Sequence, residues 1–126
     1  MRRMVIINGC FPSLNDYIDA NRTGKGRWNK GNAMKQRDQD RIIWELRRQL
    51  KGVKIVAPVF LRYKYFEKNR RRDLDNISGY FHKVFQDALV ESHILPNDNW
   101  HYIVGFSDDF YIDWKDPRIE VEIIEG

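Results

Sequence analysis

Two segments of the chain place apolar residues at the spacing of an amphipathic helix. Residues 33–50 set Ile43, Leu46 and Leu50 on one helical face and are followed by a glycine at position 52. Residues 73–92 repeat apolar positions at intervals of one turn, and the aspartate that begins this segment suits a helix N-cap. We therefore expect two main helices, the second with its apolar face formed by Ile77, Phe81, Val84, Phe85, Ala88 and Leu89.

Four other segments have the pattern of strands. Residues 59–66 and 118–124 alternate apolar and polar side chains, and residues 4–7 and 101–106 are interpreted as further strands. The resulting order, β-α-β-α-β-β, predicts an α/β (α+β) fold in which two main helices pack on a single-layer mixed sheet.

Two connections have the composition of surface loops. Residues 9–32 are rich in Gly, Asn, Asp and basic residues, so we expect a mobile loop there. Residues 107–117 are acidic and lack the glycine and terminal glutamate of a calcium-binding EF-hand loop. A solvated connection is the favoured interpretation of its four aspartates, Asp108, Asp109, Asp113 and Asp116.

Length and composition limit the class of protein. With 126 residues, of which 42% are hydrophobic, the chain suits one domain over residues 1–126. No apolar run reaches membrane-spanning length and no signal-peptide pattern is present, so we expect a soluble, cytoplasmic protein without a membrane partner. Cys10 is the only cysteine, so a metal would need oxygen or histidine ligands.

The charge is divided unevenly along the chain. Residues 1–72 carry 19 Lys and Arg against 6 Asp and Glu, whereas residues 73–126 carry 3 against 12. Clustered cations favour a polyanionic partner such as nucleic acid, and carboxylates can meet the same phosphates through divalent cations. Charge alone leaves open that both halves are solvated surface.

Asp73 and Asp75 are the first candidates for chemistry, because two carboxylates stand two residues apart where a strand ends and a helix begins. Magnesium is commonly held by two or three carboxylates together with water and substrate phosphate. Helix capping, or ion pairing with the preceding arginines, would also explain the pair. Asp98 follows the second helix and reaches the pair only if the chain turns back; ordinary turn chemistry is its alternative.

Several residues together carry a family resemblance. Residues 71–77 read Arg-Arg-Asp-Leu-Asp-Asn-Ile, and they are followed by Lys83, by Asp-Ala-Leu at positions 87–89 and by Asn-Asp at positions 97–98. A Pro-Ser-Leu-Asn sequence occupies positions 12–15. This set resembles the RusA family of Holliday-junction resolvases, whose motif is a basic run, Asp-Leu-Asp-Asn, a helix with a lysine and Asp-Ala-Leu, and a short acidic turn.

The resemblance implies a homodimeric endonuclease that depends on Mg²⁺, with Mn²⁺ as a substitute, and cuts four-way or otherwise branched DNA in recombination and repair. It also implies metal ligation by Asp73, Asp75 and Asp98, a catalytic role for Lys83, and an origin in bacteria or phage. Two positions depart from the family pattern. Gly79 stands where the best-known members have the lysine, and Asn97 is neutral in a turn that is often doubly acidic.

The basic residues beside the aspartates are expected to bind backbone phosphates: Lys68, Arg70, Arg71 and Arg72. A second candidate DNA surface comprises Lys25, Arg27, Lys30 and Lys35. Trp28 and Trp100 are candidates for stacking on bases, although packing is favoured for both. Two alternatives remain open: a non-catalytic dimeric DNA-binding module of the same fold, and a nuclease that acts on RNA.

Overall fold

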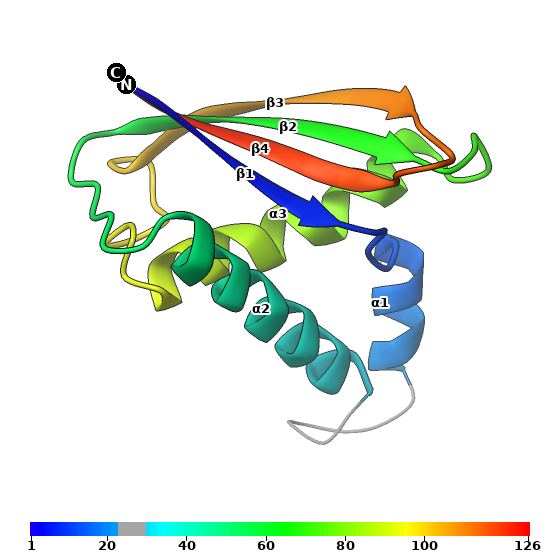
Figure 1. The fold of residues 1–126 in the computed structure, drawn as a ribbon. Helices are drawn as coiled ribbons and strands as arrows, with labels where there is room; N and C mark the ends of the chain where they lie inside the picture. Colours follow the sequence, from blue (N-terminus) through cyan, green and yellow to red (C-terminus); the bar gives the residue numbers. More distant parts are fainter. Residues whose placement is uncertain (23–29) are drawn as a thin grey trace.

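The computed structural model describes residues 1–22 and 30–126. Within these residues, three helices lie on one face of a four-stranded sheet (Figure 1). None of these helices is both long enough and apolar enough to cross a membrane. The elements in chain order are β1 (Arg2–Asn8), α1 (Leu14–Asn21), α2 (Lys30–Gln49), β2 (Val59–Glu67), α3 (Leu74–Glu91), β3 (Ile103–Ile112) and β4 (Arg118–Glu125).

The strand order of the sheet is β1-β4-β2-β3. The pairs β1·β4 and β2·β4 are antiparallel, whereas β2 and β3 are parallel, with Val59 paired to Ile103 and Glu67 to Ile112. Parallel neighbours need a crossover, which α3 provides here. The predicted fold class, a mixed sheet with helices packed on it, is confirmed.

Aromatic rings join α3 to the inner face of the sheet. Alternate residues of β2 are buried, as its sequence pattern predicts, and they include Tyr63 and Tyr65. The ring of Phe81 packs edge-on against both tyrosines, and that of Phe85 packs edge-on against Tyr63. The apolar positions expected on the two main helices are all buried: Ile43, Leu46, Leu50, Ile77, Phe81, Val84, Phe85, Ala88 and Leu89.

The loop expected over residues 9–32 was wrong for its first half, which contains helix α1. Ser13 caps this helix: its hydroxyl accepts a hydrogen bond from the amide of Asp16, whose carboxylate accepts one from the amide of Ser13. The Tyr17 ring lies 5.2 Å from that of Tyr80 in α3. Because α1 has no fully buried residue and only eight residues, it depends on this capping and docking.

The expected solvated connection over residues 107–117 was also wrong at its start, because β3 continues to Ile112. Asp108 lies within this strand. Its carboxylate accepts a hydrogen bond from the Tyr65 hydroxyl at 3.0 Å and lies 2.7 Å from Nε2 of His82. These partners come from β2 and α3, so an acidic sequence is held in a strand by contacts that local composition does not reveal.

The two edges of the sheet differ in how they are covered. At the β1 edge, the side chain of Gln49 in α2 accepts a hydrogen bond from the Ile6 amide at 2.9 Å and donates one to its carbonyl at 2.7 Å. This side chain therefore occupies the place of a neighbouring strand at β1. The β3 edge pairs only with β2 and, among the described residues, has no such cover.

We predict that Gln49→Ala lowers the free energy of unfolding by about 1 kcal/mol, because both hydrogen bonds to Ile6 are lost and water replaces them only in part. Urea denaturation measures the change. Gln36→Ala is the matched control in the same helix, since Gln36 bonds only the exposed Asp40 and the change of helix propensity is identical. Equal unfolding free energies for the two variants would contradict this role of Gln49.

Candidate metal centre and nucleic-acid interface

Asp73 and Asp75 stand at the N-terminal end of α3 with their carboxylates unused. Asp73 is the N-cap residue, yet its side chain makes no capping hydrogen bond, and Asp75 lies in the first turn. Both are exposed, and neither side chain forms an ion pair with another described residue. Capping and arginine pairing therefore do not account for them in this structure. The positive end of the helix dipole stabilises negative charge here.

Asp73 lines a cavity of about 590 Å³ at the end of β2. Arg70 and Arg72 contribute polar walls, whereas Leu74 and Phe110 contribute apolar ones. The cavity therefore combines anion-binding groups with a hydrophobic surface, the usual composition of a ligand site.

Arg72 is the structural centre of this region. Its Nε and Nη2 donate to the two carboxylate oxygens of Glu67, each at 3.0 Å, and its Nη1 donates to the carbonyl of Phe11 at 2.6 Å. Glu67 is only 7% exposed, so this bidentate pair neutralises a buried charge. Arg72 was predicted to bind DNA, but these internal bonds give it a positioning role for the residue that follows it, Asp73.

Three other cations of the same turn are free to meet anions. Lys68, Arg70 and Arg71 are exposed, and none forms an ion pair with another described residue. The Asn69 side chain accepts a hydrogen bond from the Arg71 amide at 3.0 Å and so shapes the turn. The predicted phosphate-binding role of this turn therefore has suitable side chains.

The second predicted DNA surface is described only in part. Lys30 begins α2 and is exposed, whereas Lys35 forms an ion pair with Asp87 at 2.7 Å. This ion pair links α2 to α3 and so gives Lys35 and Asp87 a structural role. Lys25 and Arg27 lie outside the described residues, as does Trp28.

Lys83 is exposed on α3, where no other described residue forms an ion pair with it. It lies eight residues after Asp75, which corresponds to about 12 Å along a helix axis. Gly79, at the position of the family lysine, faces α1: a Cβ there would meet the Leu14 side chain at 3.1 Å. Close packing of α1 on α3 explains why this position holds a glycine.

Asp98 lies in the turn between α3 and β3. The bonds that form this turn belong to its neighbours: Asn97 Oδ1 accepts from the amides of Asp98 and Asn99, and Asn99 Oδ1 accepts from the amide of His101. The Asp98 carboxylate is exposed and has no described partner. Turn chemistry therefore accounts for the asparagines but not for Asp98.

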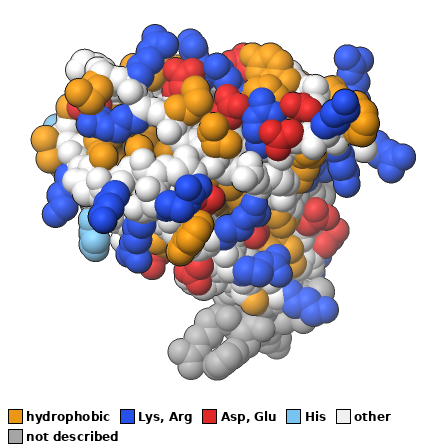
Figure 2. All heavy atoms as spheres, viewed as in Figure 1, with side chains coloured by type: hydrophobic (Ala, Val, Ile, Leu, Met, Phe, Trp, Pro, Cys, Tyr) orange, Lys and Arg blue, Asp and Glu red, His pale blue; other side chains and the backbone are white. Residues whose placement is uncertain are grey.

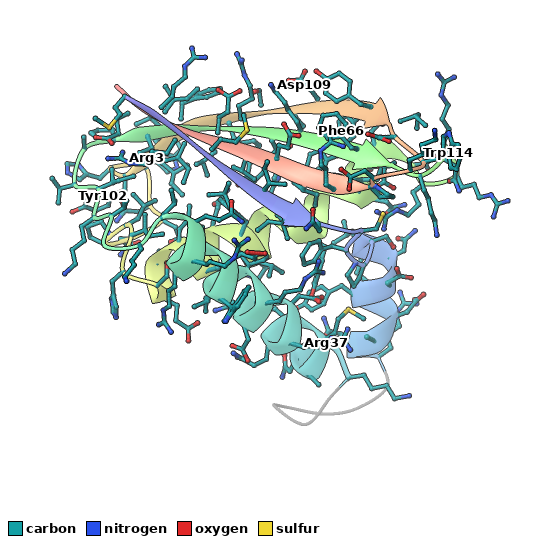
Figure 3. The ribbon with its side chains drawn as sticks, in the orientation of Figure 1. Arg3, Arg37, Phe66, Tyr102, Asp109 and Trp114 are labelled. Atoms are coloured by element: carbon teal, nitrogen blue, oxygen red, sulfur yellow. The ribbon has the colours of Figure 1, made fainter. Side chains whose placement is uncertain are left out.

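The structure does not bring Asp98 to the other two aspartates within one chain. Asp98 precedes the start of β3, at the end of the sheet where β2 begins, whereas Asp73 follows the end of β2. Figure 3 shows these opposite ends through Tyr102, just before β3, and Trp114, just after it. Among residues 1–22 and 30–126, no three Asp, Glu, His or Cys side chains form a group that could hold a metal.

Asp98 instead lines a second cavity, of about 500 Å³, with Trp100, Val104 and Phe106. The packing role favoured for Trp100 was wrong within this chain, because its side chain is 94% exposed. Val104 and Phe106 are 62% and 50% exposed. An apolar surface therefore surrounds Asp98 along β3.

Glu67 is the site residue that the sequence analysis missed. The signal was present, because Glu67 continues the buried alternation of β2 by one position beyond the predicted strand. Its carboxylate also acts on Cys10: partial desolvation first, and then the charge of Glu67, raise the pKa of the thiol.

Models of known protein families and curated protein sequences give no match to this chain. The resemblance to the RusA family therefore stays a prediction that depends on the quoted motifs.

We predict that Arg72→Ala lowers the free energy of unfolding by about 3 kcal/mol, because it leaves the buried Glu67 carboxylate without its cation. Chemical denaturation followed by circular dichroism measures this loss. Arg71→Ala removes the neighbouring arginine, which is exposed and unpaired among the described residues, and should change stability by less than about 0.5 kcal/mol. Similar values for both variants would refute the role assigned to Arg72.

Proposed function

We propose that this protein is a magnesium-dependent endonuclease that cuts branched DNA, four-way junctions in particular. The observation that carries the proposal is the pair of exposed, unused carboxylates of Asp73 and Asp75, beside the free cations Lys68, Arg70 and Arg71. Carboxylates beside phosphate-binding cations suit a divalent ion shared between protein and nucleic-acid backbone.

The donor set at the N-terminus of α3 fits Mg²⁺ in part. Asp73 and Asp75 offer two oxygen ligands, and Mg²⁺ characteristically keeps several waters and accepts substrate phosphate as a further ligand. Mn²⁺ takes the same ligand types. The chemistry that such an ion supplies is Lewis acidity toward a phosphate oxygen and a lowered pKa of coordinated water.

The side chains around this pair would hold and orient the DNA strand. Lys68, Arg70 and Arg71 would bind the backbone phosphates on either side of the scissile bond, which positions DNA without reading its bases. Arg72, through Glu67, keeps the start of α3 in place. Lys83 would contribute to charge stabilisation only if the strand passes along α3, given its distance from Asp75.

Asp98 would join this site in a homodimer rather than within one chain. The β3 edge is the open edge of the sheet, since Gln49 covers β1. This edge strand exposes Val104, Phe106, Tyr111 and Ile112, each at least 45% exposed. The two ends of this edge strand are apolar and its middle is acidic, and an uncovered edge strand can pair with another strand. A second copy supplies an identical strand through two-fold symmetry.

Such a pairing would bring Asp98 of the second copy toward the Asp73 cavity. If two copies of β3 run antiparallel with their centres at positions 107 and 108, position 103 of one chain faces position 112 of the other. Asp98 lies close before position 103, and the Asp73 cavity is lined by Tyr111 and Ile112. Each dimer would then have two composite sites, and paired incision of a four-way junction requires two sites.

We predict that Asp75→Asn abolishes Mg²⁺-dependent nicking of a synthetic four-way junction while binding is retained or strengthened, because one ligand and one phosphate-repelling charge are removed. Gel analysis of labelled junction strands and a binding assay without metal measure the two effects. Asp19→Asn is the control, since Asp19 is exposed on α1, pairs with the exposed Arg22 and does not line the cavity.

Three outcomes of this experiment discriminate among the possible functions. Wild-type cleavage by the Asp75→Asn chain would show that the site is misassigned. Binding by the wild type without any nicking would favour a non-catalytic DNA-binding module. Faster cleavage of RNA substrates than of DNA would redirect the proposal to an RNA nuclease.

A mixing experiment tests whether Asp98 acts across the dimer. We predict that Asp75→Asn and Asp98→Asn chains, each inactive alone, regain nicking when they are unfolded together and refolded as a mixture. In a mixed dimer, one composite site combines Asp73 and Asp75 of the Asp98→Asn chain with Asp98 of the Asp75→Asn chain, and is intact. The other composite site lacks both Asp75 and Asp98. The expected product is a single nick without paired incision.

The control mixture combines Asp73→Asn with Asp75→Asn chains. These two changes fall on the same chain's half of each composite site, so no mixed dimer assembles an intact one. Restored activity only in the first mixture supports the dimer arrangement. Inactivity of both mixtures, despite dimers detected by light scattering, means that Asp98 does not act in trans.

A further inference from the structure

The exposed side of α2 forms a continuous band of cations that the proposed site does not use. We define this α2 strip as Arg37, Arg41, Trp44, Arg47, Arg48 and Lys51, all of which are exposed. At 100° per residue the five residues that lie in α2 fall within one face of the helix, opposite the buried Ile42 and Leu46, and Lys51 follows just after the helix ends at Gln49. Figure 2 shows Lys and Arg side chains over this helix, which faces the viewer.

Internal ion pairs use only part of the strip's positive charge, with Arg37 3.8 Å from the carboxylate of Asp38. Arg47 and Lys51 form no ion pair with another described residue. The one carboxylate within the strip's arc, Asp40, accepts a hydrogen bond from Gln36. Glu45 lies at its flank and is bonded by Arg48. Favourable contact with the helix C-terminus explains Arg47, Arg48 and the nearby Lys51, but not Arg37 or Arg41.

The strip and the candidate site flank the same loop. Arg41 donates to the carbonyl of Asn8 and stands 4.7 Å over the Phe11 ring. Arg72, which lines the cavity of the candidate site, donates a hydrogen bond to the carbonyl of the same Phe11. A single polyanion that contacts Lys68–Arg71 is therefore able to continue over this loop onto α2.

We propose that the α2 strip is a second DNA-contact surface, which binds the phosphate backbone of a duplex arm beyond the arm that enters the site. The inference rests on the proposed function for the identity of the polyanion. The helical part of the strip, from Arg37 to Arg48, is about 17 Å long, and this length of duplex carries about five phosphates per strand. Trp44, 64% exposed, lies at the centre of the strip with Arg48 over its ring at 5.6 Å.

The test compares two charge-matched double variants. Arg47→Gln with Lys51→Gln removes two free cations of the strip and leaves Arg41, which supports the loop, in place. Arg2→Gln with Arg62→Gln removes two cations from the opposite, open face of the sheet. Binding of a fluorescent four-way DNA junction is measured by anisotropy in EDTA over a range of salt concentrations, and thermal unfolding checks that both variants fold.

We expect the strip variant to bind about tenfold more weakly, and the slope of log affinity against log salt to fall by about 1 to 2, since each phosphate contact contributes about 0.9. The control should keep the wild-type slope. Equal slopes for the two variants overturn the inference, as does a strip variant that loses binding to poly-glutamate but not to DNA. Because no metal is present, failure of nicking leaves this result unaffected, and the two proposals are tested separately.

Discussion

A buried carboxylate at the end of β2 is the constraint on which the candidate site depends. Glu67 is almost inaccessible to water, so its charge requires a cation and well-aligned donors. Arg72 supplies both, and its third hydrogen bond, to Phe11, ties the loop after β1 to the same point. Because Asp73 is the next residue and stands at the N-cap position of α3, this ion pair helps to fix the position of the free carboxylates of Asp73 and Asp75. The internal ion pair between Arg72 and Glu67 therefore supports the acidic site.

The β2-α3-β3 crossover has a second consequence, for Asp98. A helix of 18 residues is about 27 Å long, close to the length of the strands that it connects. The chain therefore returns to the end of the sheet at which β2 began, and Asp98 is left there with exposed Trp100, Val104 and Phe106. Antiparallel association along β3 is the simplest arrangement that reverses this separation, because a two-fold axis places the start of one β3 beside the end of the other. The fold thereby links metal binding to association in the proposed function.

Periodicity predicted the sheet and both main helices because their apolar positions repeat along the sequence. It did not predict α1, whose eight residues bury little and are held by the Ser13 cap and by packing on α3. The acidic second half of β3, residues 107–112, was missed for the same reason, since Asp108 is held by His82 and Tyr65 from distant segments. At the site, the sequence indicated which aspartates to consider, but only the structure shows that Asp73 makes no capping bond and that Arg72 is occupied internally. The role of each of these side chains depends on its contacts in the tertiary structure, and the local sequence pattern does not reveal those contacts.

Some cations of this chain pair with carboxylates and others are free to bind phosphate. This difference affects how DNA would be bound in the proposed function. Arg72, Lys35 and Arg118 are committed to carboxylates, so the net charge overstates the number available to phosphate. Without metal, Asp73 and Asp75 repel the same phosphates that Lys68, Arg70 and Arg71 attract. Affinity for DNA in that state therefore needs cations away from the aspartates. The α2 strip meets this requirement, because its cations outnumber Asp40, the one carboxylate within its arc. In the proposed function, binding through α2 and metal-dependent cutting at α3 would then be separable, although Arg41 of α2 and Arg72, just before α3, contact the same loop after β1.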